Sequence, residues 1–262
     1  MRETMKNKVN KTVIYLVLIV ALAGALRVAR ALQEERYSTD ACFYFRIAKD
    51  WARYGAAYVY LYDADHTPPL LPWTMALSYD FGLTPEYTAL GLGILFGMLM
   101  PLGAFWIALN LFPEPLEGNR DFLIGGRYAY ALLAAFLVAV HPFFIRISVS
   151  CLREIFYLPL VVFGIAFALS AIRRKSLVKW CFFAVFVALA NLTRREGIVI
   201  LGIFFIWQFL EFCVDRKAFR KDILYHFSSV CCVSAVFLVI TLPVMYSLSG
   251  MSCAWAPLLV SL

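Results

Sequence analysis

Long apolar runs separated by short polar stretches recur along the whole chain. A transmembrane helix needs about 20 mostly apolar residues to cross the hydrocarbon core. Seven segments meet or approach that length and are predicted to be membrane helices: 12–31, 88–111, 128–142, 152–172, 180–193, 198–214 and 227–248. Two of them, 128–142 and 180–193, are short, so we expect them to include flanking residues or to lie oblique in the bilayer.

The stretch 33–87 lacks a spanning segment and carries a different pattern. From Asp40 onward, apolar residues recur at four-residue spacing until Gly55, a residue suited to end a helix. The recurring residues are Phe43, Ile47 and Trp51. We therefore predict an amphipathic helix that lies at the membrane interface rather than across it. Pro68 and Pro69 then interrupt the chain before it returns to an apolar surface.

The composition agrees with this pattern. Of 262 residues, 63% are apolar and only 16% are charged, whereas soluble domains are about half apolar and about a quarter charged. Much of the apolar surface must therefore lie in lipid. We predict an all-α fold, a multi-pass transmembrane helical bundle of about seven spans that forms a single membrane domain over 1–262. The cysteines show no CxxC or Cys/His metal spacing and are interpreted as packing residues.

The basic residues cluster in alternate connections between the predicted spans. The net charge is +7, and the clusters are the N-terminus, Arg120 with Arg127, 173–179 and 216–221. By the positive-inside rule these connections and the N-terminus face the cytoplasm. The stretches 33–87, 141–153 and 193–197 then lie on the outer side. We interpret the charge as a determinant of topology and expect no nucleic acid partner.

The basic N-terminus followed by an apolar run also resembles a secretory signal peptide. Further apolar segments follow, and Arg27 and Arg30 continue the same predicted helix, which favours an uncleaved first membrane helix. We therefore expect a multi-pass protein of the cell (inner) membrane, with membrane lipids as partners and an extracytoplasmic active face.

Ionisable side chains gather on the predicted outer side, although at membrane depth each costs at least about 2.5–3.5 kcal/mol. They are Asp40, Asp63, Asp65, His66, Arg146, Arg153, Glu154, Arg194, Arg195 and Glu196. A carboxylate can remove the proton of an acceptor hydroxyl, and guanidinium groups can hold a leaving phosphate. The set therefore suits glycosyl transfer from a phosphate-bearing lipid.

Structural interpretations exist beside the chemical ones. Asp40 can be the N-cap of the helix that follows it. Asp63 and Asp65 can form a turn before the prolines, and as oxygen ligands for Mg²⁺ or Mn²⁺ they are a weak signal. Arg153 and Glu154 can form an ion pair at the start of a helix, where a carboxylate is favoured by the helix dipole.

The run Arg194–Gly197 can be a short polar hairpin between two helices. Its two arginines oppose the charge bias of the outer side, so they need a compensating charge, which an anionic ligand would supply. His141 is interpreted as marking a helix end, because Pro142 follows it, and His226 as a solvated residue beside a basic segment.

Several stretches occur in an order that resembles the membrane-embedded GT-C glycosyltransferases. The resemblance is to the branch of dolichyl-phosphate-mannose–protein mannosyltransferases (glycosyltransferase family 39) and lipid A aminoarabinose transferases. The matching features, spread over about 27–200, are an N-terminal helix ending in arginine, Asp40 with Tyr44 and Ala48, Pro68-Pro69-Leu70 with Pro72, Pro142 through Ser148 to Arg153–Tyr157, and the run Ala188–Gly197.

The resemblance implies an inverting transfer of a sugar from a polyprenyl-phosphate carrier, at a site on the outer membrane face. It makes Asp40 the base or the group that orients the acceptor, with Tyr44 beside it as a candidate substrate contact. Glu154 takes the acidic position at the outer end of a later helix. Arg194 matches the arginine of the family's Leu-Thr-Arg stretch.

The chain departs from the family at three of these positions. Many members have Glu where this chain has Ala41, and aminoarabinose transferases have a phosphate-contacting Lys where this chain has Thr67. Arg195 replaces the family's Pro. Binding of the donor phosphate therefore falls to Arg153, Arg194 or Arg195.

Members of the family usually continue through further helices, so the resemblance covers only the N-terminal part of such an enzyme. The chain is then expected to be a fragment, a truncated gene product, or one piece of a split enzyme with a C-terminal partner half. A divalent cation, Mg²⁺ or Mn²⁺, is the one cofactor for which the outer carboxylates offer oxygen ligands. Two other functions remain open. One is a transporter or flippase of a lipid-linked sugar, which would show repeated halves and a site near the midplane; the other is a non-catalytic membrane subunit.

Overall fold

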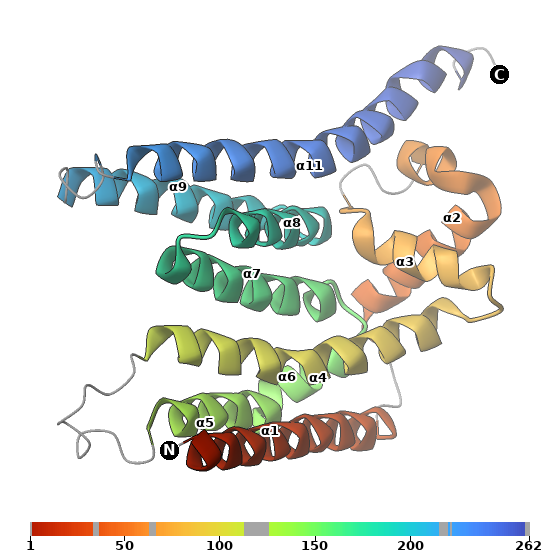
Figure 1. Cartoon of the computed structure of the whole chain (residues 1–262). Helices are drawn as coiled ribbons and strands as arrows, with labels where there is room; N and C mark the ends of the chain where they lie inside the picture. The colour runs from red at the N-terminus through yellow and green to blue at the C-terminus, as the bar shows by residue number, and fades with distance from the viewer. Residues whose placement is uncertain are drawn as a thin grey trace.

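The computed structural model describes residues 2–33, 37–62, 67–112, 126–214, 220 and 222–259, and every regular element within them is an α-helix (Figure 1). The helices are α1 (Arg2–Ala31), α2 (Thr39–Tyr62), α3 (Leu70–Tyr79), α4 (Pro85–Leu111), α5 (Gly126–Val140), α6 (Pro142–Val149), α7 (Glu154–Arg174), α8 (Leu177–Thr193), α9 (Gly197–Val214) and α11 (Ile223–Leu259). The predicted all-α class is confirmed.

Five of the described helices are long and apolar enough to cross a membrane: α4, α7, α9 and the greater parts of α1 and α11. Helices α5 and α6 make a sixth span if taken together, bent by 52° at the break between them. Helix α8 is apolar but has only 17 residues. Each predicted segment thus corresponds to one of these helices, and the multi-pass bundle is confirmed. Length and composition assign five or six spans rather than about seven, because α8 is short.

The bend between α5 and α6 has a chemical cause. Pro142 has no amide hydrogen to continue the helix, and Nδ1 of His141 caps the new helix by accepting from the Phe143 amide at 3.2 Å. The Ala139 carbonyl, which that amide would bond in a continuous helix, instead accepts from Nη1 of Arg27 at 3.3 Å. The prediction that His141 marks a helix end is confirmed.

Arg27 joins four helices from inside the bundle. Its side chain is fully buried, with 0% exposed. Nη1 also donates to the Ala23 carbonyl at 2.9 Å, and Nε donates to Oγ of Ser148 in α6 at 3.0 Å. Gly97 of α4 makes room, since a Cβ there would lie 2.3 Å from the Arg27 Nε. The guanidinium thus joins α1 to α5 and α6 by hydrogen bonds and packs closely against the α4 backbone at Gly97.

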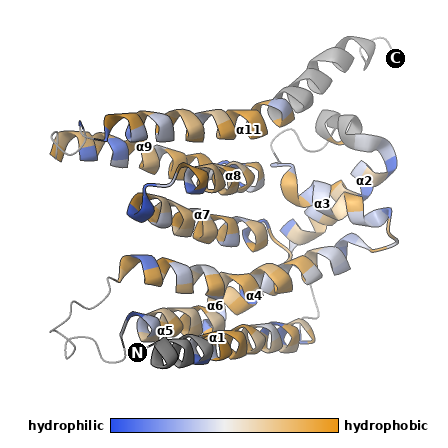
Figure 2. Ribbon diagram, in the orientation of Figure 1, coloured by the Kyte–Doolittle hydropathy of each residue, from blue (hydrophilic) through white to orange (hydrophobic). Residues whose placement is uncertain are grey.

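The long helices run side by side, with α1, α4, α5 and α6 in one half, α7, α8, α9 and α11 in the other, and α4 packed against α7 (Figure 1). One buried apolar cluster joins α2, α3, α4, α7 and α8, and a second joins α7, α8, α9 and α11. Apolar residues cover most of these helices (Figure 2). Many face away from the bundle, such as Ile203, Ile206 and Leu210 of α9, as a lipid surrounding requires.

Helix α2 is not among the candidate spans of the described residues, as expected for an interfacial helix. It begins after Ser38, whose Oγ accepts from the Ala41 amide at 3.2 Å. The interpretation of Asp40 as the N-cap is therefore wrong, and Asp40 lies in the first turn. Gly55 adopts φ 83° and ψ 169°, a conformation that favours glycine. It breaks the helix as predicted, but helical turns resume as far as Tyr62.

Alternate connections lie at opposite ends of the bundle (Figure 1). The α6–α7 and α8–α9 connections lie at the end beside α2 and α3, which we call the α2 end. The α7–α8 connection and the start of α5 lie at the other end. These carry Arg127 and the run Arg173–Lys175, so we call it the basic end. The separation agrees with the predicted topology, and the assignment of the basic end to the cytoplasm stays a prediction.

Candidate functional site

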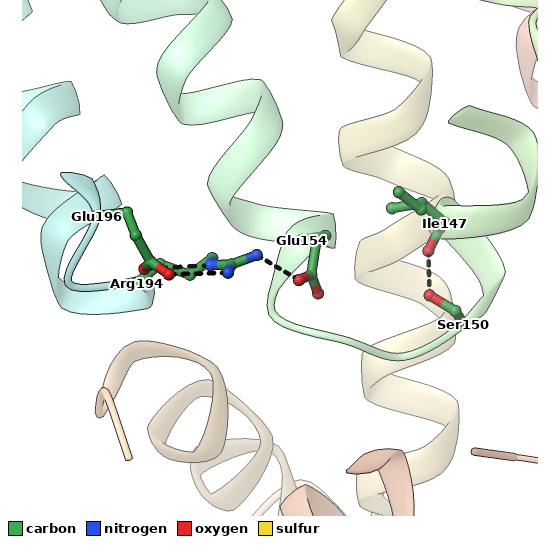
Figure 3. A network of polar contacts seen from close by, with 5 residues as sticks. All are labelled: Ile147, Ser150, Glu154, Arg194 and Glu196. Carbon is green, nitrogen blue, oxygen red and sulfur yellow. Dashed lines mark hydrogen bonds and ion pairs between the residues drawn. The ribbon is translucent and has the colours of Figure 1, made fainter. Parts of the chain in front are cut away.

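Charged side chains meet at the α2 end, where α7 begins and the α8–α9 turn passes (Figure 3). Nη1 of Arg194 lies 2.5 Å from Oε1 of Glu154, the first residue of α7. Nη2 lies 2.9 Å from Oε1 of Glu196, and Nε donates to Oε2 of Glu196 at 3.3 Å. One guanidinium is thus shared by two carboxylates. We call Glu154, Arg194 and Glu196 the Arg194 triad.

The backbone holds this triad in a tight turn. The Gly197 amide donates to the Arg194 carbonyl at 2.9 Å as α9 begins. A Cβ on Gly197 would lie 2.4 Å from the amide nitrogen of Asn191, so the turn requires glycine at this position. On the other side, Oγ of Ser150 donates to the Ile147 carbonyl at 2.7 Å and closes α6 before α7 starts (Figure 3). The predicted polar hairpin between two helices is confirmed.

The contact between Arg194 and Glu196 favours the charged form of both side chains. Hydrogen bonds from Arg194 lower the pKa of the Glu196 carboxyl, and the same bonds raise the pKa of Arg194. The Arg194 guanidinium also lies 5.5 Å from the ring centroid of Tyr157 on α7, at cation–π distance. The charge that this arginine was expected to need therefore comes from carboxylates of the chain itself.

A second guanidinium, that of Arg153, lies 5.7 Å from the ring centroid of Tyr44 on α2. Tyr44 is 7% exposed. Burial raises the pKa of its hydroxyl, the charge of Arg153 opposes that rise, and the charge of Asp40 adds to it. Asp40 precedes Tyr44 by four positions, so the two share one face of α2. The Tyr44 hydroxyl is therefore influenced both by the charge of Asp40 on α2 and by the charge of Arg153, which precedes α7.

Arg153 and Asp40 differ from Arg194 in their partners. Among the described residues, no carboxylate forms an ion pair with Arg153 and no basic group forms one with Asp40. The interpretation of Arg153 and Glu154 as an ion pair is wrong, because Glu154 pairs with Arg194. Asp40 and Arg195 are exposed. The site thus combines a satisfied triad with an accessible carboxylate and guanidinium groups that have no carboxylate partner in the described chain.

Packing brings the stretches that resemble the glycosyltransferases together around this site. Leu71, which follows the two prolines, is fully buried and belongs to one cluster with Tyr44 and Ala48 of α2. The same cluster includes Ile155 of α7 and Ala190 of α8. Residues from four separate parts of the sequence therefore form one buried apolar cluster, which includes the Tyr44 ring that Arg153 contacts.

The other predicted site residues are placed less centrally. Thr67 is half-buried just before α3. Asp63, Asp65 and His66 lie outside the described residues, so their metal role stays a prediction. Within the described part of the chain, no group of three His, Cys, Asp or Glu side chains could hold a metal ion.

The interpretation of His226 as solvated is wrong. It is 5% exposed, and its Nδ1 lies 2.9 Å from Oε1 of Gln208 in α9. Nε2 of Gln208 in turn donates to Oγ of Ser229 at 2.8 Å. His226 lies in the first turn of α11, which begins at Ile223, and its side chain is buried inside the bundle. A glutamine inside the apolar run 198–214 was the signal that could have revealed this buried polar group.

Two polar contacts at the α2 end were not anticipated. Nζ of Lys49 in α2 lies 2.7 Å from Oε1 of Glu86 in α4, a pair that only the packing of the two helices could reveal. The other contact is that of the Arg194 guanidinium with the Tyr157 ring. Tyr157 lies three residues after Glu154, and that spacing places both side chains on one face of α7, which could have indicated the contact.

No family model matches this chain, and no curated protein matches it either. The class of the protein therefore rests on its fold and geometry. It is a multi-pass helical membrane protein with a charged site at one end of the bundle.

Proposed function

We propose that this protein is a membrane glycosyltransferase of the GT-C type, which moves a sugar from a polyprenyl-phosphate carrier to an extracytoplasmic acceptor. One observation supports the proposal above the others. Arg153 lies over Tyr44 without a carboxylate partner in the described residues, and the exposed Asp40 lies on the same face of α2 as Tyr44. Holding a leaving phosphate and removing a proton require a guanidinium and a carboxylate that do not neutralise each other.

Arg153 is the best-supported contact for the donor phosphate. A guanidinium binds phosphate through two parallel hydrogen bonds. Arg153 also directly precedes α7, whose first amides and dipole favour an anion. Arg194 is occupied by two carboxylates, so its role is to hold Glu154 away from Arg153. Arg195, exposed in the next turn, is the second candidate for the phosphate.

Asp40 is the proposed base. Its carboxylate accepts the proton of the acceptor hydroxyl as the hydroxyl oxygen bonds to the anomeric carbon of the sugar. The bond between that carbon and the phosphate oxygen breaks, and polyprenyl phosphate leaves with the electron pair. Attack from the face opposite the phosphate inverts the configuration. The Tyr44 hydroxyl, with its raised pKa, stays protonated and can donate a hydrogen bond to the phosphate.

The surface beside the charged groups suits a lipid-linked donor. Ile198 and Val199, the residues after the turn that carries Arg194, are 55% and 57% exposed. An isoprenoid chain can lie against these side chains while its phosphate reaches the guanidinium groups.

The test reconstitutes the full chain in phospholipid vesicles with tritium-labelled polyprenyl-phosphate mannose, glucose or aminoarabinose. A membrane extract supplies acceptors. The measurements are the release of polyprenyl phosphate and the appearance of label in the acceptor. We expect Asp40→Asn to lower the transfer rate about 100-fold or more, because a general base contributes about 10²- to 10⁴-fold. We expect Arg153→Gln to weaken donor use about tenfold or more, the loss of a hydrogen bond to a charged group.

Two matched variants serve as controls. Asp80→Asn and Arg53→Gln remove an exposed carboxylate at the end of α3 and an exposed guanidinium on α2, and both should transfer sugar like the wild type. Full activity in Asp40→Asn would remove the base from the proposal. Movement of the labelled lipid across the bilayer without release of polyprenyl phosphate would identify a transporter. An absence of transfer from every donor in the wild type would reject the function.

A further inference from the structure

A polar cavity lies at the basic end, away from the proposed active site. Its volume is about 320 Å³, and it opens between the last turns of α4 and α7 and the first turn of α5. Its lining residues are Trp106, Leu109, Asn110, Arg127, Arg173 and Arg174. Three guanidinium groups from two helices therefore border one space.

Contacts among the lining residues hold the wall in place. Nη1 of Arg173 donates to the Leu109 carbonyl at 3.0 Å and ties the end of α7 to α4. Nδ2 of Asn110 donates to the Trp106 carbonyl at 2.8 Å. The Trp106 ring packs against Phe167 at a centroid distance of 4.5 Å. The cavity is thus built on the packed α4–α7 pair.

The charge of the lining is one-sided. In the described part of the chain, no carboxylate pairs with Arg173 or Arg174. These two lie in the last turn of α7, where the helix dipole favours a cation. Arg127 is the second residue of α5, where the dipole disfavours one. An anion in the cavity would be stabilised by the first amides of α5 and by the guanidinium groups of Arg173 and Arg174.

The position of the cavity indicates which anion. It lies at the ends of helices that are apolar enough to span a membrane, and thus at the level of lipid headgroups. Trp106 has the amphipathic character that places tryptophan at that level. Leu111 and Ile172, next to the lining residues of α4 and α7, are apolar and 58% and 37% exposed, so they can contact acyl chains.

We infer that this cavity binds the phosphate of an anionic phospholipid headgroup. Basic pockets between transmembrane helices are suited to such headgroups. The site does not involve Asp40 or Arg153, so it stands whether or not the proposed transfer reaction is confirmed.

Native mass spectrometry of the purified full chain tests the inference. The protein in detergent is mixed with equal amounts of phosphatidylglycerol and phosphatidylcholine, and the retained lipids are counted. We expect the wild type to retain phosphatidylglycerol preferentially. Arg174→Gln should weaken that retention about fivefold, and Arg173→Gln with Arg174→Gln about 25-fold, because each basic residue near a lipid surface contributes about fivefold.

Arg220→Gln is the matched control, since it removes an exposed arginine that does not line the cavity. It should retain phosphatidylglycerol like the wild type. Arg174→Lys keeps the charge and should lose less than Arg174→Gln. Unchanged thermal unfolding of each variant separates a binding defect from misfolding. Inorganic phosphate should compete only weakly, because it lacks acyl chains.

Three results would overturn the inference. One is equal retention of the two lipids by the wild type, which would show that the cavity does not select an anionic headgroup. Another is an equal loss in Arg220→Gln and Arg174→Gln, which would show a general effect of net charge. The third is full displacement of the lipid by inorganic phosphate, which would assign the site to free phosphate instead.

Discussion

The two ends of the bundle hold their arginines in different surroundings. At the α2 end, Arg194 is neutralised by Glu154 and Glu196, while Arg153 and the exposed Asp40 are left for other partners. At the basic end, the guanidinium groups of Arg127, Arg173 and Arg174 line a single cavity. Charges of both signs suit a reaction in which a proton and a phosphate move in concert. Charges of one sign suit the binding of an anion that does not react.

The largest expected effect concerns the bundle as a whole and comes from Arg27, which joins α1 to α5 and α6. Arg27→Leu leaves the Ala139 carbonyl and Ser148 without their donor and should lower the free energy of unfolding by about 2–3 kcal/mol. Ser148→Ala, which removes one acceptor, should cost about 0.6 kcal/mol. Unfolding in mixed micelles measures both values. If Arg27→Leu is as stable as the wild type, the guanidinium does not stabilise the packing of α1 against α5 and α6.

The second effect is confined to the α2 end and tests the division of labour between its arginines. Arg194→Gln releases Glu154, which can then pair with Arg153, so sugar transfer should fall about 10- to 100-fold. Adding Glu154→Gln removes the competing carboxylate and should restore about tenfold of that loss. The measurement is the transfer rate in vesicles, analysed as a double-mutant cycle. Losses that simply add would show that Glu154 itself takes part in the reaction.

The third effect is a small loss of stability in acid that originates at the α2 end. Arg194 lowers the pKa of Glu196, so the pair contributes its full stability above the ordinary glutamate pKa of about 4.3. That contribution is lost as the pH falls through the lowered pKa of the folded state. Melting temperatures between about pH 3 and 7 should therefore decline less steeply in acid for Glu196→Gln than for the wild type. Salt should shrink the difference, since Glu196 is largely exposed. Parallel curves for the two proteins would contradict this origin.

The smallest effect lies at the basic end and has the opposite sign. The hydrogen bond to Asp222 raises the pKa of Lys175, so the stability from this pair is present below the ordinary lysine pKa of about 10.4. It is lost as the pH rises through the raised pKa of the folded state. Lys175→Arg should keep the pair charged and extend the stable range in alkaline solution. If melting curves above about pH 10 coincide for the two proteins, this exposed pair does not contribute to stability.

The local chemistry of the chain was sufficient to predict the long apolar helices and two of the helix breaks, but not the short helices α3 and α6. Apolar runs marked every candidate membrane span of the described residues, because burial in lipid depends on the hydropathy of about 20 neighbouring residues and not on distant partners. Alternation of basic connections predicted which helix ends lie together, and the structure separates them into an α2 end and a basic end. Pro142 and Gly55 predicted breaks, because their effect on the backbone is intrinsic.

Only the tertiary structure decided which charged side chains meet. Arg194 pairs with Glu154, 40 positions away, rather than Arg153 with its neighbour, because α7 and the α8–α9 turn pack together around one apolar cluster. Helix packing elsewhere in the bundle likewise placed His226 of α11 against Gln208 of α9 and brought three arginines around one cavity. Hydropathy is a property of each segment and can be summed along the chain, whereas an ion pair exists only at the distance that packing sets.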